Sequence, residues 1–203
     1  MPIVPSRRDV LIATVGLGAL LVPSMAMASE VIGTTMRVQG EGVLTRAKGV
    51  LKLQAQGDLI EGDRVKTMKH SFAELQLFTQ TQINLGPDSS FAIDRFVADL
   101  GGVITIGGAM AFDRPEGLPP LDLTLRSAFA QIGVRGTRFF AGRSKGVYSV
   151  FVDRGSVQIS AGGRVRRLQA GDGIEVPVAG DDPGPVVKWG AARIAAAFAS
   201  VGL

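Results

Sequence analysis

Residues 132–141 read IGVRGTRFFA, and this tract interrupts an apolar strand pattern with two glycines and two arginines. Glycine inside a strand usually marks a bend, a bulge or a close backbone approach, and arginine is disfavoured in a core. We therefore expect Gly136 to lie where the backbone bends or where a neighbouring strand crosses closely. Because side chains alternate between the two faces of a strand, the odd separation of Arg135 and Arg138 predicts that they point to different faces.

The same apolar–polar alternation recurs on both sides of this tract. It is clear in VLKLQA (50–55), AELQLFT (73–79), VYSVFV (147–152) and SVQIS (156–160). Glycine- and aspartate-containing turns separate these segments, so that one strand with its turn occupies roughly 8–12 residues, a spacing typical of sandwiches, rolls and barrels. The sequence predicts an all-β fold: an antiparallel β-sandwich or β-roll, jelly-roll-like, with a proline-rich loop at 113–123 between two halves.

The last sixteen residues, KWGAARIAAAFASVGL (188–203), have a different pattern. They are rich in alanine and place Ile194, Phe198 and Val201 at helical spacing, which predicts a short C-terminal α-helix packed against a sheet. The expected organisation is an export signal at 1–28, a β domain at 29–187 and the helix at 188–203.

The first 28 residues have the three-part layout of a signal peptide. Arg7 and Arg8 precede an apolar run from residue 10 to residue 22, and Ala26 and Ala28 offer small side chains just before Ser29. At about 1.5 Å per residue this run reaches roughly 20 Å, short of the ~30 Å hydrocarbon core of a bilayer. We expect cleavage after Ala28 and a periplasmic location, and an uncleaved membrane anchor is the alternative.

The arginine pair also fits a twin-arginine export signal. The segment Ser6-Arg7-Arg8-Asp9-Val10-Leu11 has the required order, although valine replaces the usual aromatic residue. A general secretory signal that contains two arginines is the competing interpretation. An exported chain without cysteine has no disulfides, so packing and backbone pairing must supply its stability.

The catalytic and metal-binding patterns in the sequence are incomplete, which favours a non-enzymatic protein. Gly142-Arg143-Ser144-Lys145-Gly146 fits the nucleophile-elbow pattern, but a strand pattern follows it and the sole histidine, His70, precedes it. We interpret this pentapeptide as a hairpin turn. One histidine cannot complete the ligand set of a metal-binding cupin barrel, and Asp58 and Asp63 lack the spacing of an established calcium loop. No cofactor is expected.

Charge is distributed unevenly along the chain. Residues 29–125 carry nine Lys/Arg against twelve Asp/Glu, whereas residues 126–203 carry eleven against five, which gives net charges of −3 and +6. Export argues against nucleic acid as the partner of the basic half. A periplasmic or outer-membrane protein, or an anionic envelope polymer, is the expected partner. The candidate binding residues are Arg135, Arg138, Arg164, Arg166 and Arg167.

The order of these patterns resembles the FecR domain family, the periplasmic part of ferric-citrate-type regulators. The resemblance rests on the segment LKLQAQGDLIEGDRVKTMKHSFAELQLFTQTQINLGPDSSFAI (51–93), on LRSAFAQIGVRGTRFFAG (125–142), and on VDRGSVQIS (152–160) with the closing LQAGDGIEV (168–176). It implies a periplasmic module.

Regulators of this family carry a cytoplasmic sigma-factor-binding domain before a membrane helix, whereas nine residues precede the apolar run here. The resemblance therefore implies the periplasmic module without the cytoplasmic role. Our expectation is a module that binds a protein or an anionic envelope component. The alternative is a membrane-anchored sensor that relays the state of an outer-membrane receptor.

Overall fold

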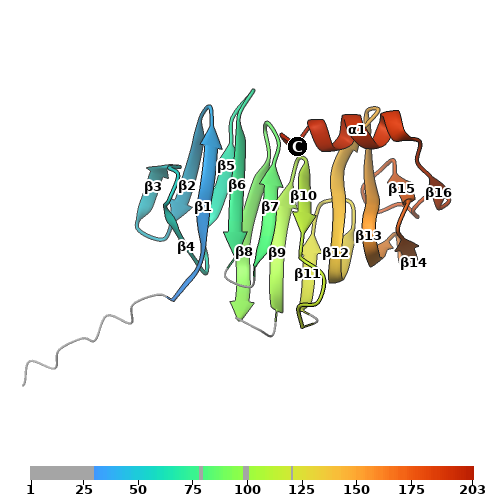
Figure 1. Cartoon of the computed structure of the whole chain (residues 1–203), viewed down its shortest axis with the longest axis horizontal. Helices are drawn as coiled ribbons and strands as arrows, with labels where there is room; N and C mark the ends of the chain where they lie inside the picture. Colours follow the sequence, from blue (N-terminus) through green and yellow to red (C-terminus); the bar gives the residue numbers. More distant parts are fainter. Residues whose placement is uncertain (1–29, 78–79, 98–100, 120) are drawn as a thin grey trace, which may run out of the picture.

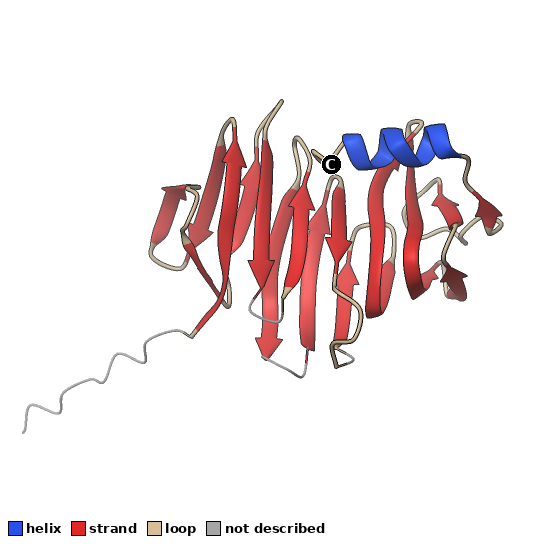
Figure 2. Ribbon diagram, viewed as in Figure 1, coloured by secondary structure: helices blue, strands red, loops and turns tan. Residues whose placement is uncertain are grey.

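The computed structural model describes residues 30–77, 80–97, 101–119 and 121–203 (Figure 1). Within them most of the chain is β-structure, with one short C-terminal helix, as predicted (Figure 2). The elements are β1 (Val31–Gln39), β2 (Gly42–Arg46), β3 (Gly49–Lys52), β4 (Asp58–Ile60), β5 (Arg64–Thr67), β6 (Phe72–Leu77), β7 (Thr81–Leu85), β8 (Ser90–Val97), β9 (Gly101–Gly107), β10 (Met110–Asp113), β11 (Asp122–Arg126), β12 (Gln131–Ser144), β13 (Val147–Ala161), β14 (Arg164–Gln169), β15 (Asp172–Val176), β16 (Val187–Lys188) and α1 (Ala191–Ala199).

The strands form one continuous sheet that turns back on itself at β12. Its order is β3-β2-β5-β8-β9-β11-β12-β10-β7-β6-β1-β4, and β13 adds β14, β15 and β16 beside β12. We call β3-β2-β5-β8-β9-β11 the first arm and β10-β7-β6-β1-β4 the second arm. One cluster of buried apolar side chains includes Phe91 and Leu123 of the first arm and Leu75 and Ile83 of the second. The core therefore lies between the arms.

The predicted strand pairing is antiparallel, and one pair differs. β9 and β11 run parallel, with Asp122 opposite Gly101 and Arg126 opposite Thr105. The connection between β10 and β11 explains the difference. It leaves the second arm at Asp113 and enters the first arm at Asp122, so β11 takes the direction of β9. The proline-rich loop predicted at 113–123 is this crossing.

The tract at 132–141 is the place where β12 changes arms. Residues up to Val134 pair with β11, and residues from Arg138 onward pair with β10. The register with β13 shifts between Arg135 and Arg138, and shifts again between Arg138 and Phe139. A bulge of this kind bends a strand and increases its twist. Of the two alternatives expected at Gly136, these register shifts support the bend. Its effect is larger than a local kink, because the bend joins the two arms of the sheet.

The paired phenylalanines that follow the bend enter two different cores. Phe139 belongs to the core between the arms and stacks on Phe112 with 5.2 Å between the ring centroids. Phe140 lies on the opposite face, in a second apolar cluster with Phe151, Trp189 and Phe198. Alternation along a strand requires this division. Phe140 therefore faces the layer formed by α1.

Helix α1 covers the outer face of the sheet beside β12 and β13 (Figure 1). Arg193 anchors it: its guanidinium lies 3.8 Å from the Trp189 ring centroid and donates to Glu175 Oε1 at 2.7 Å. Its Nε also donates to Ser144 Oγ at 3.0 Å. Across the described residues, no helix combines the length and apolar character that a bilayer crossing requires.

The turn between β12 and β13 settles the meaning of the nucleophile-elbow pattern. Lys145 and Gly146 have φ angles of 54° and 82°, and strands flank them on both sides. Two consecutive residues with positive φ form the tight turn that joins antiparallel strands. The predicted hairpin is confirmed.

Candidate functional site

A hollow of about 610 Å³ lies on the face of β11–β14 that points away from the core. Gly133 of β12 is opposite Gln158 of β13, and Gln158 is opposite Arg167 of β14, so the three residues form one row across the strands. Asp122 of β11 and Val165 of β14 also line the hollow. The row exists because the strands pair in register and every second side chain points outward.

Gly133 leaves space within this row. A Cβ atom built on Gly133 would find no heavy atom closer than the Gln158 carbonyl oxygen, at 3.9 Å. A side chain at this position would therefore project into the hollow without displacing the backbone. The glycine that interrupts the strand pattern in the sequence has two neighbours with longer side chains, Gln158 and Arg167.

The hollow carries opposite charges and an apolar side chain. Asp122 is exposed on β11, Arg167 is exposed on β14, and Val165 beside Arg167 is 50% exposed. Arg167 Nη2 lies 3.5 Å from Ser156 Oγ, a long contact that leaves most of its donors free. These groups suit an extended segment with polar and apolar side chains. They offer hydrogen bonds to its backbone as well as its side chains.

The three arginines predicted together on β14 do not form one cluster. Arg167 shares the outward face with Val165, whereas Arg166 shares its face with Leu168, which is fully buried in the core. Arg164 is bound to the carboxylate of Asp182. The strand pleat separates residues 166 and 167, which are adjacent in sequence. Only Arg167 contributes to the hollow.

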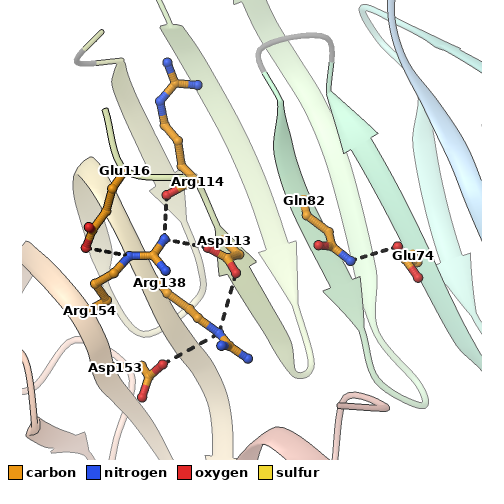
Figure 3. Close-up of polar contacts among 8 residues, drawn as sticks. All are labelled: Glu74, Gln82, Asp113, Arg114, Glu116, Arg138, Asp153 and Arg154. Atoms are coloured by element: carbon orange, nitrogen blue, oxygen red, sulfur yellow. Dashed lines mark hydrogen bonds and ion pairs between the residues drawn. The ribbon is translucent and has the colours of Figure 1, made fainter. Parts of the chain in front are cut away.

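Arg138 lies on the other side of the bend, in a cluster of charged side chains (Figure 3). Its Nε lies 3.6 Å from Asp113 Oδ2 and 3.7 Å from Asp153 Oδ2. Its guanidinium carbon is 5.1 Å from the centroid of the Phe198 ring in α1, within range of a cation–π contact. Arg138 is therefore occupied by groups of its own chain.

Arg154 of β13 completes this cluster and connects it to the crossing segment after β10. Its Nη2 donates to Asp113 Oδ1 and to the Arg114 carbonyl oxygen, both at 2.8 Å, and its Nε lies 3.3 Å from Glu116 Oε1 (Figure 3). Arg114 itself is buried and donates to Pro119 O at 2.8 Å. Partly exposed ion pairs contribute little net stability. Their role here is to hold the crossing segment against the bend.

A smaller hollow of about 230 Å³ lies beside this cluster on the second arm. Glu74, Gln76 and Gln82 line it with Asp113, and Gln82 Nε2 donates to Glu74 Oε1 at 2.8 Å (Figure 3). Its polar groups already bond to one another. The larger hollow is therefore the stronger binding candidate.

Several predicted residues fall outside what the structure describes. The export residues Arg7, Arg8, Ala26, Ala28 and Ser29 lie in the undescribed first 29 residues. For Arg135 only the backbone is described, opposite Ser156. The prediction that Arg135 and Arg138 point to different faces assumed that side chains alternate without interruption between them. The bulge that follows Arg135 interrupts this alternation, so the prediction loses its basis.

One of the two carboxylates weighed as calcium ligands, that of Asp63, has another role. Asp63 is fully buried and bound by Arg46, whose Nε and Nη2 donate to its two oxygens at 2.7 and 2.6 Å. The described residues contain no group of three or more histidines and carboxylates arranged to hold a metal ion.

Sequence reasoning overlooked most of the hollow. Asp122, Ser156 and Gln158 have ordinary strand positions and no motif of their own. Gly133 was the available signal, since a glycine inside an otherwise regular strand indicates a missing side chain as well as a bend. Whether such a glycine marks a bend or a space for a ligand depends on the neighbouring strands.

Comparison with known proteins shows which family the central part of the chain resembles. Residues 63–158, just under half of the chain, match the family described as FecR protein. The resemblance drawn from the sequence ran further, to residue 176. The matched region contains the Asp63 turn, the bend of β12 and the Gly133–Gln158 part of the hollow.

Two crystal structures of a candidate anti-sigma factor from Parabacteroides distasonis have a similar fold. One, at 1.65 Å, is 16% identical with a TM-score of 0.53, covering 66% of this chain and 63% of that chain. The other, at 2.50 Å, is 18% identical with a TM-score of 0.55, covering 66% and 62%. The chain thus spans less than two thirds of the length of the protein it resembles. No curated protein gives a significant match. The match at residues 63–158 confirms the resemblance to the FecR family over that part of the chain.

Proposed function

We propose that this chain is the periplasmic, non-enzymatic binding module of a FecR-type signal-transduction regulator, and that it binds an extended segment of a partner protein in the hollow of β11–β14. The observation that carries the proposal is the row Gly133–Gln158–Arg167, in which a missing side chain lies beside two exposed polar ones. The family match and the fold of the candidate anti-sigma factor support the signalling context.

The lining of the hollow favours binding over catalysis. Among the residues that line it, Asp122 is the only carboxylate, and Ser156 has neither a histidine nor a lysine beside it. Glycosidase chemistry requires two facing carboxylates, and a nucleophilic serine requires an adjacent base. The groups present suit hydrogen bonding and charge recognition.

The periplasmic location is tested by the mass of the chain recovered from separated periplasm and membranes. We expect a soluble form that begins at Ser29, because Ala26 and Ala28 offer the small side chains that signal peptidase requires. A membrane-bound form that retains residues 1–28 would contradict this location. It would favour the alternative of an anchored sensor.

The binding function is tested by photo-crosslinking in cells. A photoreactive phenylalanine derivative replaces Gln158 in the hollow, and a control chain carries it at Arg166, on the opposite face of the neighbouring strand. We expect a protein adduct of defined mass from position 158 and none from position 166. Gly133→Leu should reduce the adduct at least fivefold by filling the hollow, and Arg167→Glu should do so by reversing its charge.

Arg166→Glu is the matched charge control and should leave the adduct unchanged, because Arg166 lies outside the hollow. Equal adducts from both positions would contradict the proposed site, as would an adduct insensitive to Gly133→Leu and Arg167→Glu. A polysaccharide adduct would contradict the protein partner. The Gly133→Leu chain should fold normally, since the nearest heavy atom to its Cβ is 3.9 Å away.

A further inference from the structure

Strand β3 forms a free edge of the sheet at the end distant from the hollow (Figure 1). The backbone N–H of Leu53 donates to the Gly42 carbonyl oxygen at 2.9 Å, and the register continues as Leu44 opposite Leu51 and Arg46 opposite Gly49. Hydrogen-bonded and non-hydrogen-bonded pairs alternate along an antiparallel ladder. The N–H and C=O groups of Val50 and Lys52 therefore point away from β2.

Apolar side chains are exposed on this edge. Val50 is 67% exposed and Leu51 is 53% exposed. A hollow of about 360 Å³ runs beside them, lined also by Val43, Met68 and the acidic residue Glu41. Exposed edges with apolar side chains recruit further strands unless charge or a covering element prevents it. Within the described residues, no segment covers β3.

Four unpaired cations lie near the edge, against one acidic residue, Glu41, in the lining of its hollow. Lys48 and Lys52 flank Val50 in sequence, and Lys66 and Arg64 lie on β5, two strands away. All four are exposed, and none forms an ion pair or a side-chain hydrogen bond within the described residues. This contrasts with Arg138, Arg154, Arg164, Lys188 and Arg193, which are paired with carboxylates.

The positive charge near β3 favours one kind of pairing strand over another. A second copy of β3 paired antiparallel about Val50 would place Lys48 opposite Lys52, and pairing about Lys52 would place Lys52 opposite itself. Pairing about Leu51 would make the two Lys52 side chains diagonal neighbours, about 7–8 Å apart. Like charges directly opposite each other destabilise a strand pair. A strand that carries carboxylates would instead gain from both lysines, within the ~10 Å over which charges act at ordinary ionic strength.

We propose that β3 pairs with an extended, acidic strand of another protein, which adds to the first arm of the sheet. Its backbone bonds to the outward groups of Val50 and Lys52. One of its apolar side chains packs beside Leu51, and its carboxylates lie beside Lys48 and Lys52. This surface is separate from the hollow of β11–β14 and does not depend on the function proposed for it.

Hydrogen exchange on the free chain provides the first test. The amides of Val50 and Lys52 should exchange rapidly, and the amide of Leu51, which bonds to β2, should exchange slowly. Slow exchange at Val50 and Lys52 would mean that another part of the chain or a second copy already covers the edge. That result would overturn the proposal.

The second test uses a capped nine-residue peptide of alternating glutamate and valine, with a lysine–valine peptide of the same length as control. We expect the glutamate peptide to bind at least tenfold more tightly and to slow exchange at Val50 and Lys52. The variant Lys48→Glu/Lys52→Glu should reverse this preference. Equal binding of the two peptides, or an unchanged preference in the variant, would overturn the acidic partner.

Backbone pairing is tested with Val50→Pro, which removes an outward N–H donor, against Val50→Thr, which keeps it. The proline variant should lose at least tenfold in affinity for the glutamate peptide, and the threonine variant should change it less than threefold. Equal binding of both would overturn strand addition. Arg167→Glu should leave peptide binding unchanged, so a failure at this edge is distinguishable from a failure at the hollow.

Discussion

Replacement of Asp63 by alanine is expected to lower the free energy of unfolding by about 3 kcal/mol, because removing one partner of a buried ion pair leaves the other without compensation. Arg46 donates to both oxygens of Asp63, at 2.7 and 2.6 Å, and the Ile60 N–H donates to Oδ2 at 2.9 Å. The carboxylate is fully buried, and its hydrogen bond raises the pKa of Arg46. The Arg46 side chain is 27% exposed and reaches water in part, which limits the loss.

Denaturant unfolding followed by circular dichroism measures this loss. Asp58→Ala is the matched control, because Asp58 is exposed and its hydrogen bond with Arg46 uses the backbone carbonyl oxygen, at 2.9 Å, which the substitution keeps. Its carboxylate acts on Arg46 only as a nearby charge. It should change the unfolding free energy by less than about 0.5 kcal/mol. A double variant, Arg46→Ala/Asp63→Ala, should be less destabilised than the sum of the single changes. Equal losses for Asp63→Ala and Asp58→Ala would show that the pair carries no particular weight.

Replacement of Gly173 by alanine is expected to release Trp189 and loosen α1. A Cβ atom on Gly173 would lie 2.0 Å from Trp189 Nε1, far inside van der Waals contact. Trp189 stacks on Phe151 with 4.9 Å between ring centroids, and the Arg193 guanidinium lies 3.8 Å from the centroid of its ring. The indole must therefore move away from these contacts. We expect a loss of about 2–3 kcal/mol, as for overpacked cores.

The chain has one tryptophan, so its fluorescence reports this change directly. Trp189 is 7% exposed, and its emission should shift to longer wavelength when the ring moves into water. Gly190→Ala is the matched control, since no heavy atom lies within 4 Å of a Cβ at Gly190 and its φ is −81°. An unshifted emission for Gly173→Ala would contradict the packing described for Trp189.

Net charge along the sequence was a poor guide to the exposed charge of the folded chain. The basic second half suggested an arginine surface, yet Arg138, Arg154 and Arg164 are paired with carboxylates from distant segments. The unpaired cations beside β3 come from the half with net negative charge. Which arginines form ion pairs depends on which strands become neighbours. The net charge of a stretch of sequence contains no such information.

The sequence by itself determined the features that depend on short-range rules. Alternation predicted the strands, the Lys145–Gly146 turn followed from the preference for positive φ, and apolar spacing predicted the helix at Phe198. The bend at Gly136 was also predictable, because glycine and charge in a strand mark an irregularity. Each of these conclusions uses residues within a few positions of one another.

Only the tertiary structure decided how the arms fold together and which residues meet. The parallel pairing of β9 with β11, the separation of Arg166 from Arg167 and the row Gly133–Gln158–Arg167 all depend on strand order and register. These are set by long-range packing of the whole apolar core. A one-residue change in register moves every side chain of a strand to the opposite face, so no local pattern determines the site.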